Sequence, residues 1–169
     1  MKVLETERLI LRKVVREDAP FILGLLNEPS WLRFIGDRGV RTLEGAQDYI
    51  TQVPQAQYAR EGFGLYLVER KSDGVPMGMC GLLKRDSLEH VDIGYALMPS
   101  FWGQGYALEA VSAALAQGRR DFGLKRVAAI VSNDNASSIK LLEKLGFQFE
   151  RYIRMPGATE DISLFLTKE

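Results

Sequence analysis

The sequence contains little that would form covalent or metal cross-links. Cys80 is the only cysteine and His90 the only histidine among 169 residues. A single cysteine cannot close a disulfide within the chain, and one cysteine with one histidine make a poor zinc set. We therefore expect a fold held by its hydrophobic core, without a metal. Cys80 lies in an apolar segment with Met77 and Met79, so we expect a buried, inert thiol and not a covalent nucleophile.

The chain also lacks an excess of charge and a long apolar segment. It has 22 Lys and Arg against 22 Asp and Glu. This balance argues against bulk electrostatic binding to nucleic acid or to a membrane surface. No apolar run approaches the roughly 20 residues that span a bilayer, and the acidic segment Met1–Arg8 does not resemble a secretory signal. We expect a cytoplasmic protein that binds neither nucleic acid nor membrane.

Enough apolar sequence is present for one packed domain over residues 1–169, since 46% of the residues are hydrophobic. The order of predicted elements is a strand, early helices, a hairpin, then strand–helix–strand–helix–strand–strand, which indicates an α/β fold with a mixed sheet. The predicted strands cover residues 6–12, 63–69, 75–83, 91–98, 126–131, 147–153 and 162–166. The predicted helices begin at Asp18, Thr42, Gly105 and Asn135. Pro54 should kink or split the second of them.

The stretch Ser100–Ala110 carries the most specific signal. Gly103 and Gly105 lie where an apolar strand passes into a helix. The first N–H groups of such a helix lack partners, and the positive end of the helix dipole points to the same place. Glycine lets a ligand approach the backbone, so the pattern predicts an anion site, most naturally for phosphate. A dinucleotide fingerprint would need a small residue at Leu108, and a P-loop would need Gly-Lys-Ser/Thr, which is absent.

Two blocks of sequence resemble the GNAT N-acetyltransferase superfamily. Gly103-x-Gly105-x-Ala107 is similar to its coenzyme A pyrophosphate loop, although Trp102 stands where Gln or Arg is usual. The variant Trp-Gly-x-Gly-Tyr-Ala resembles the ribosomal-protein N-terminal acetyltransferase branch. The second block, residues 135–147, is similar to the family pattern Asn-x-x-Ser/Ala-Ile-x-Leu-Tyr/Leu-Glu-Lys-x-Gly-Phe. The blocks stand in the expected order, and the resemblance covers essentially the whole chain.

The resemblance implies a GNAT fold. This is an α/β fold with a mixed, mostly antiparallel central sheet of about seven strands, splayed between the fourth and the fifth and flanked by about four helices. It further implies acetyl-CoA as co-substrate, whose pyrophosphate would lie on backbone N–H groups of the glycine loop while its pantetheine arm pairs with the end of the 91–98 strand. The implied coenzyme contacts are Leu97, Met98, Gly103, Gln104, Gly105, Tyr106, Ala107, Leu108 and Asn135. Two alternatives stay open: a tight turn without ligand, and Asn135 as a plain helix cap.

The proton for the departing thiolate needs a donor. Many members of the family use a tyrosine at the position of Leu142, which cannot donate. In the ribosomal branch a serine at the position of Ser138 is a proposed donor, so the resemblance implies that role here. The alternative is a first-turn serine that bonds its own backbone. A backbone N–H freed by the splay near Tyr95–Leu97 would stabilise the oxyanion.

The amine acceptor needs a base, because an amine with a pKa near 10 is mostly protonated at pH 7. Strand alternation places His90 and Asp92 on one face of the 91–98 strand. Asp92 occupies the Asp/Glu-Ile-Gly-Tyr position that is common in the branch and is the first candidate. His90 is the second and Glu89 the third. Each has the alternative of being a polar residue on a solvated strand face.

The predicted function is transfer of the acetyl group from acetyl-CoA to a primary amine, on a protein N-terminus or a small molecule, by direct attack in a ternary complex. The alternative is a coenzyme A-binding sensor or interaction module without turnover. A different acyl donor, such as succinyl-CoA, also stays open, because the loop reads phosphates and not the acyl group. The expected assembly is a monomer or a homodimer.

Overall fold

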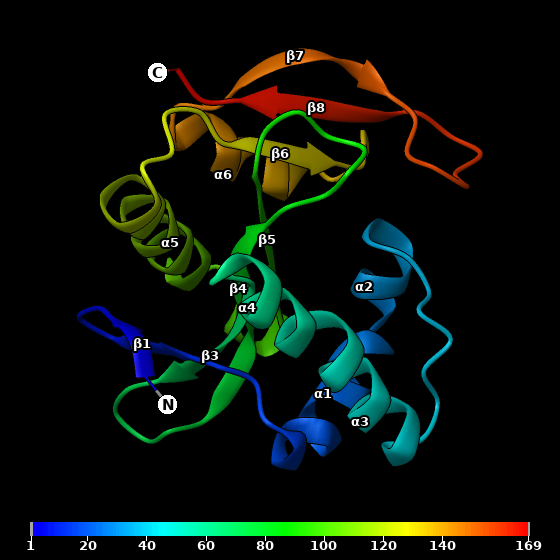
Figure 1. Cartoon of the computed structure of the whole chain (residues 1–169), viewed down its shortest axis with the longest axis vertical. Coiled ribbons are helices and arrows are strands. Elements are labelled where there is room, and N and C mark those ends of the chain that lie inside the picture. Colours follow the sequence, from blue (N-terminus) through cyan, green and yellow to red (C-terminus); the bar gives the residue numbers. More distant parts are fainter. Residues whose placement is uncertain (1, 169) are drawn as a thin grey trace.

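The computed structural model describes residues 2–168, which form one open sheet of eight strands with helices on both faces (Figure 1). The strands are β1 (Lys2–Glu5), β2 (Leu9–Arg12), β3 (Leu65–Arg70), β4 (Pro76–Leu83), β5 (Asp92–Leu97), β6 (Ala128–Val131), β7 (Gln148–Ile153) and β8 (Ile162–Leu166). Their order across the sheet is β1-β2-β3-β4-β5-β6-β8-β7. Neighbours pair antiparallel except β5 and β6, which are parallel. The predicted mixed, mostly antiparallel sheet is confirmed.

Strands β5 and β6 separate after a short contact. Their register consists of one pair, Asp92 with Ala128, and the Ala128 N–H donates to Val91 O at 2.9 Å. Figure 1 shows the two strands running in clearly different directions from there. In the numbering of the sequence prediction these are the fourth and fifth strands, so the splay lies where it was expected.

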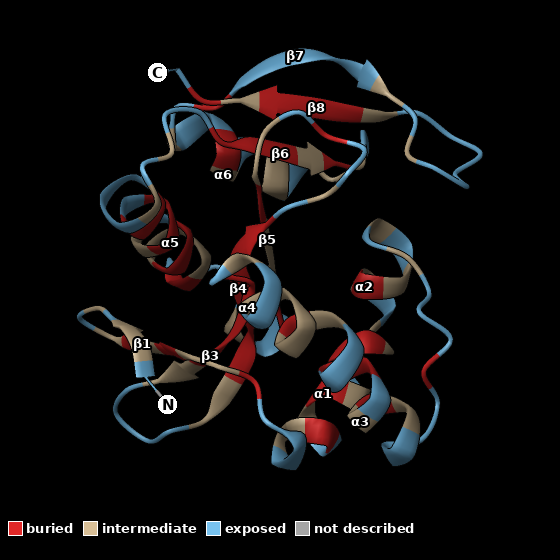
Figure 2. Ribbon diagram, in the orientation of Figure 1, coloured by how far each residue is buried: buried red, intermediate tan, exposed pale blue. Residues whose placement is uncertain are grey.

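The helices divide between the two faces of the sheet. They are α1 (Ala19–Leu26), α2 (Pro29–Phe34), α3 (Leu43–Ile50), α4 (Ala56–Glu61), α5 (Tyr106–Phe122) and α6 (Ala136–Lys144). The first three bury side chains such as Ile22 and Tyr49 against one face, while α5 and α6 bury Val111 and Leu142 against the other. Figure 2 shows the buried residues following the inner side of α5 and the central strands. Within residues 2–168, we find no helix with the length and apolar character that a membrane span requires.

Proline splits the helix predicted to start at Thr42. Thr42 caps α3 by accepting a hydrogen bond from the Gly45 N–H at 3.0 Å. The helix then widens into a π-helical turn over Thr51–Gln55, which contains Pro54, and continues as α4. The wider turn accommodates a residue that has no N–H and whose ring collides with the preceding turn of a regular helix. Residues 30–41, for which the sequence indicated neither a clear helix nor a clear strand, form most of α2 and then a loop.

The sequence prediction missed one strand and misplaced the ends of others. β1 pairs with β2 through Leu4 and Leu11 and brings the sheet to eight strands in the described chain, against about seven expected. Four residues with a single register irregularity carry too little alternation to reveal a strand. β6 begins at Ala128, two residues later than predicted, because the first hydrogen bond between β6 and the β5 segment runs from the Ala128 N–H to Val91 O.

Candidate functional site

The loop between β5 and α5 leaves an open backbone surface at the start of α5. Gly103 and Gly105 have φ angles of 75° and 81°, which side-chain-bearing residues rarely adopt. Gly105 is the N-terminal cap of α5, and no side chain caps it within the described residues. A Cβ on Gly103 would meet no atom within 4 Å. The first N–H groups of α5 therefore point into open space beside the positive end of a 17-residue helix.

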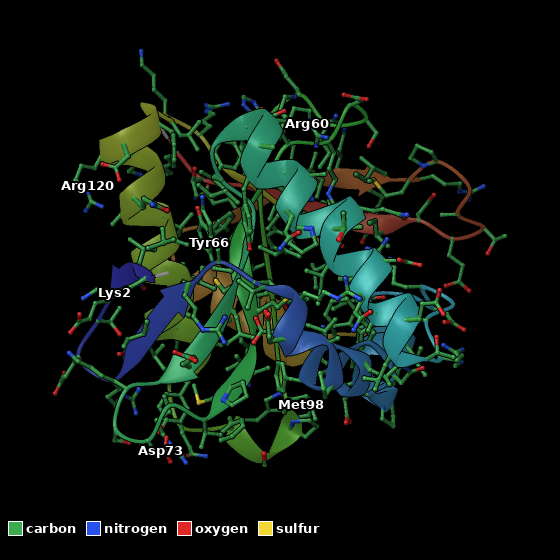
Figure 3. All side chains as sticks on the ribbon, turned by 60° about the horizontal axis from the view of Figure 1, so that its bottom comes forward. Lys2, Arg60, Tyr66, Asp73, Met98 and Arg120 are labelled. Carbon is green, nitrogen blue, oxygen red and sulfur yellow. The ribbon has the colours of Figure 1, made fainter. Side chains whose placement is uncertain are left out.

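The edge of β5 that faces the splay offers further hydrogen-bonding groups. The Met98 N–H donates to Met77 O of β4 at 2.8 Å, and Met98 O accepts from the Phe101 N–H. Because alternate residues of an antiparallel strand bond the same neighbour, the backbone groups of Tyr95 and Leu97 point toward the gap. The groups that face the gap thus belong to Leu97 and Tyr95, one and three residues before Met98. Figure 3 labels Met98 at the foot of its view, where β5 ends.

Trp102 occupies part of this edge. Its indole Nε1 donates to Leu97 O at 2.8 Å, and 52% of the residue remains exposed. The carbonyl of Leu97 is therefore used inside the protein, while its N–H faces the gap. A tryptophan at this position, where the family usually has Gln or Arg, ties the glycine loop to the strand and presents an aromatic surface beside both.

The start of α6 joins β5 across the gap through two hydroxyl groups. The Tyr95 hydroxyl and Ser138 Oγ lie 2.5 Å apart, and either can donate. Asn135 is the N-terminal cap of α6, its Oδ1 accepting from the Ser138 N–H at 3.3 Å. Burial raises the pKa of Tyr95 to about 12, against the opposing hydrogen bond from Ser138. The structure thus adds Tyr95 to the predicted donor Ser138.

Sequence reasoning had no signal for that pairing beyond strand alternation. Alternation places Tyr95 on the face opposite Asp92, and the structure agrees, since Tyr95 packs with the core that includes α5 and α6. The partner lies 43 residues later in the chain. Leu142, which replaces the usual tyrosine, is buried in the same core. Figure 3 also labels Tyr66 on β3, near the centre of the molecule, which belongs to this core.

Asp92 is buried on the other face of β5. It is 0% exposed, and Arg85 Nε donates to its carboxylate at 3.1 Å. Burial raises the pKa of Asp92 to about 6, although the Arg85 charge and hydrogen bond oppose the rise. Arg85 is a partner that the sequence did not indicate. A carboxylate with this pKa exchanges its proton close to neutral pH, as a general base should.

The two other base candidates lie in the segment before β5. His90 and Glu89 line a hollow of about 260 Å³, together with Ala128, Leu164 and Met155 from later parts of the chain. His90 has 31% of its side chain exposed and Glu89 has 86%. Both are therefore more open to water than Asp92.

Cys80 behaves as its apolar neighbours indicated. It is a free, fully buried thiol in β4, and burial raises its pKa to about 12. A buried thiol with such a pKa carries almost no thiolate at neutral pH, so it does not serve as a nucleophile.

Comparison with known proteins identifies the class. Residues 8–148 match the family model of the acetyltransferase (GNAT) domain. The uncharacterised N-acetyltransferase YoaA of Bacillus subtilis is 32% identical over 153 residues, which cover 90% of this chain and 86% of the relative. The chain therefore belongs to the GNAT acetyltransferase family and is an acyltransferase.

Solved structures agree on the fold. An acetyltransferase of the GNAT family from Bacillus anthracis superposes with a TM-score of 0.78 at 22% identity, covering 98% of this chain and 96% of its own. A ribosomal L7/L12 α-N-protein acetyltransferase, RimL, solved in complex with coenzyme A, superposes with a TM-score of 0.83 at 19% identity, covering 99% and 98%. The resemblance to the ribosomal branch is thus confirmed at the level of the fold.

Proposed function

We propose that this protein transfers the acetyl group of acetyl-CoA to a primary amine, on a protein N-terminus or a small molecule, by direct attack in a ternary complex. The observation that carries the proposal is the uncapped start of α5 at Gly105, next to the free edge of β5. An anionic pyrophosphate suits the first, and an extended amide-bearing arm suits the second. The coenzyme A in the RimL structure supports the same donor.

Binding of the donor would use backbone groups chiefly. The pyrophosphate accepts hydrogen bonds from N–H groups of the loop from Gly103 to Leu108. The pantetheine arm pairs with the groups of β5 that face the gap, at Tyr95 and Leu97. Asn135 keeps its side-chain NH₂ for an amide of the arm, because its Oδ1 caps α6. Capping and coenzyme binding are therefore compatible roles for Asn135.

The reaction needs a proton donor for the departing thiolate and a base for the attacking amine. The amine nitrogen attacks the thioester carbonyl carbon, the oxyanion accepts a hydrogen bond from a β5 N–H near Tyr95–Leu97, and the carbon–sulfur bond then breaks. Ser138, hydrogen-bonded to the Tyr95 hydroxyl, gives a proton to the departing thiolate. Asp92, on the opposite face of β5, takes a proton from the amine through water, since its carboxylate is fully buried.

The proposed acceptor is a primary amine. RimL is described as an α-N-protein acetyltransferase of ribosomal L7/L12, which favours an α-amine as the acceptor of this protein too. Primary amines in general also fit the chemistry. His90 and Glu89 remain second and third candidates for the base. We also propose a cytoplasmic protein, a monomer or homodimer, that needs neither metal, nucleic acid nor membrane.

A thiol-release assay tests this function. Purified protein is incubated with acetyl-CoA and a panel of peptides with free N-termini, polyamines and aminoglycosides, and free coenzyme A is measured. We expect release that depends on one class of amine and that is faster with acetyl-CoA than with succinyl-CoA. Tight binding of acetyl-CoA without amine-dependent release would contradict turnover and favour a coenzyme-sensing module.

A further inference from the structure

Arg8, just before β2, makes several contacts with the glycine loop and the first turns of α5. Its Nε donates to Glu109 Oε1 at 2.7 Å, and its Nη1 donates to Gln104 O at 3.0 Å. Its guanidinium lies 4.3 Å from the centroid of the Tyr106 ring. Figure 1 shows the β1–β2 hairpin lying beside the start of α5. One side chain thus links the N-terminal hairpin to Gln104 and Tyr106 of the candidate pyrophosphate loop and to Glu109 just after it.

The bond to Gln104 O fixes the direction of a peptide plane. In a trans peptide the carbonyl and the following N–H point in opposite directions. Since the Gln104 carbonyl points toward Arg8, the Gly105 N–H points away from it, toward the open side of the loop. No backbone or side-chain group within residues 2–168 accepts from that N–H. Were the plane to flip, a carbonyl oxygen would face the anion in place of a donor.

Arg8 also balances a carboxylate in the first turn of α5. Besides the Nε bond, the Arg8 backbone N–H donates to Glu109 Oε2 at 2.9 Å, and Thr6 Oγ1 donates to it at 2.5 Å. Burial acts to raise the pKa of Glu109, but these hydrogen bonds outweigh it and keep the pKa low, so the group is ionised. Without Arg8, an uncompensated negative charge would lie close to the proposed pyrophosphate.

We propose that Arg8 is a positioning residue for the coenzyme: it holds the Gln104–Gly105 peptide so that the Gly105 N–H faces the pyrophosphate, and it neutralises Glu109 beside it. This rests on the proposed binding of acetyl-CoA at the glycine loop. Arg8 lies behind the loop, since a Cβ on Gly105 would come within 3.3 Å of Arg8 Nη2. It therefore acts through the loop and needs no contact with the coenzyme.

Lysine cannot replace arginine in this arrangement. The planar guanidinium donates to Glu109 and Gln104 from different nitrogens while its face covers the Tyr106 ring, and an ammonium group has one nitrogen on a flexible stem. Arg8→Lys keeps the charge and gives up this geometry. Arg8→Gln removes both the charge and the geometry.

The test is calorimetric titration of acetyl-CoA into the wild type, Arg8→Lys, Arg8→Gln and the control Arg120→Gln. The control removes an exposed arginine near the other end of α5, where Arg120 pairs with Asp121. Circular dichroism and melting temperatures report folding. We expect Arg8→Gln to lose about tenfold to hundredfold in affinity, the value of about one hydrogen bond to a charged group. Arg8→Lys should lose most of this, and Arg120→Gln should bind as the wild type does.

The outcomes separate the two claims. If the wild type does not bind acetyl-CoA, the proposed function fails, and the role of Arg8 fails with it. If the wild type binds and Arg8→Lys equals it, charge alone suffices and the positioning role is wrong. A merely structural arginine would lower the melting temperature of both variants and leave their affinity unchanged. If Arg8→Gln does not fold, the Arg8→Lys result decides.

Discussion

The hydroxyl pair of Tyr95 and Ser138 is the smallest unit on which the proposed mechanism depends. We expect Ser138→Ala to lower kcat by about tenfold to hundredfold, because the thiolate loses a positioned proton donor. The dissociation constant for acetyl-CoA should change little. Steady-state kinetics with any amine that supports thiol release, together with calorimetry, check both quantities. Ser137→Ala, an exposed serine on the same helix, is the matched control and should leave kcat unchanged. Equal kcat values for the two variants would remove Ser138 from the mechanism.

Asp92 gives a prediction about stability and pH. Burial raises its pKa from 3.8 to about 6 in the folded protein. A carboxyl group whose folded pKa is raised favours folding in its protonated form, so its contribution is full below about pH 4 and is lost as the pH rises through about 6. The difference corresponds to about 3 kcal/mol at most. The free energy of unfolding of Asp92→Asn, measured relative to the wild type, should therefore rise between pH 4 and pH 6 and then level off.

Urea unfolding of both proteins at several pH values between 4 and 7.5 measures this difference. Asp86→Asn, which removes an exposed carboxylate from the preceding loop, is the control for the substitution itself. A difference that falls over the same range would mean that Arg85 outweighs burial and that Asp92 is held ionised. Asp92 would then be a structural anion and a poor base at neutral pH.

At the scale of elements, the loop before α5 carries an optical reporter. The chain has two tryptophans, of which Trp31 is 5% exposed and Trp102 is 52% exposed. If acetyl-CoA binds along β5 and the glycine loop, it covers the indole of Trp102 and leaves Trp31 as it is. We expect the tryptophan fluorescence emission to shift toward shorter wavelength as acetyl-CoA is added. The midpoint of this shift should equal the dissociation constant from calorimetry. A shift that persists in Trp102→Phe would place the ligand elsewhere.

The close pairing of β3, β4 and β5 depends on glycines at positions where the backbone of a neighbouring segment leaves no room for a Cβ. A Cβ on Gly81 would lie 1.9 Å from Gly64 O, an atom of the backbone that cannot move aside. We expect Gly81→Ala to lower the free energy of unfolding by about 3 kcal/mol or more. Gly24→Ala, on the exposed side of α1 with no atom within 4 Å, should raise it by about 0.5–1 kcal/mol. Urea unfolding compares the two, and equal effects would contradict the packing.

Local sequence was enough to predict most elements and not enough to predict what joins them. The glycine loop, the break at Pro54 and the cap at Asn135 were readable because each depends on the conformation of a few consecutive residues. The pairing of Arg8 with Glu109 spans 101 residues, and that of Tyr95 with Ser138 spans 43. Such pairs arise only when the sheet brings distant segments together, and a single sequence carries no periodic signal for them.

For the whole molecule, the proposed mechanism places donor binding and proton removal on opposite faces of the splayed sheet. Tyr95 and Ser138 lie toward α5 and α6, where the proposed donor binds, and Asp92 lies on the face that α1–α3 cover. Between the two faces, β5 and β6 share only one register pair in the described chain, Asp92 with Ala128. In the proposed direct attack, the amine would approach the thioester from the side opposite the coenzyme.

The central claim is that the start of α5 binds the pyrophosphate of acetyl-CoA. The most direct measurement is calorimetric titration of acetyl-CoA into the wild type, Gly103→Glu and Gly123→Glu. A side chain on Gly103 would enter open space beside the start of α5, whereas one on Gly105 would point toward Arg8. Gly123 ends α5 with a φ of 64°, so the control carries a similar backbone strain and the same added charge at the far end of the helix. We expect micromolar binding by the wild type and by Gly123→Glu, and none by folded Gly103→Glu. Equal binding by all three proteins, or none by the wild type, would contradict the account.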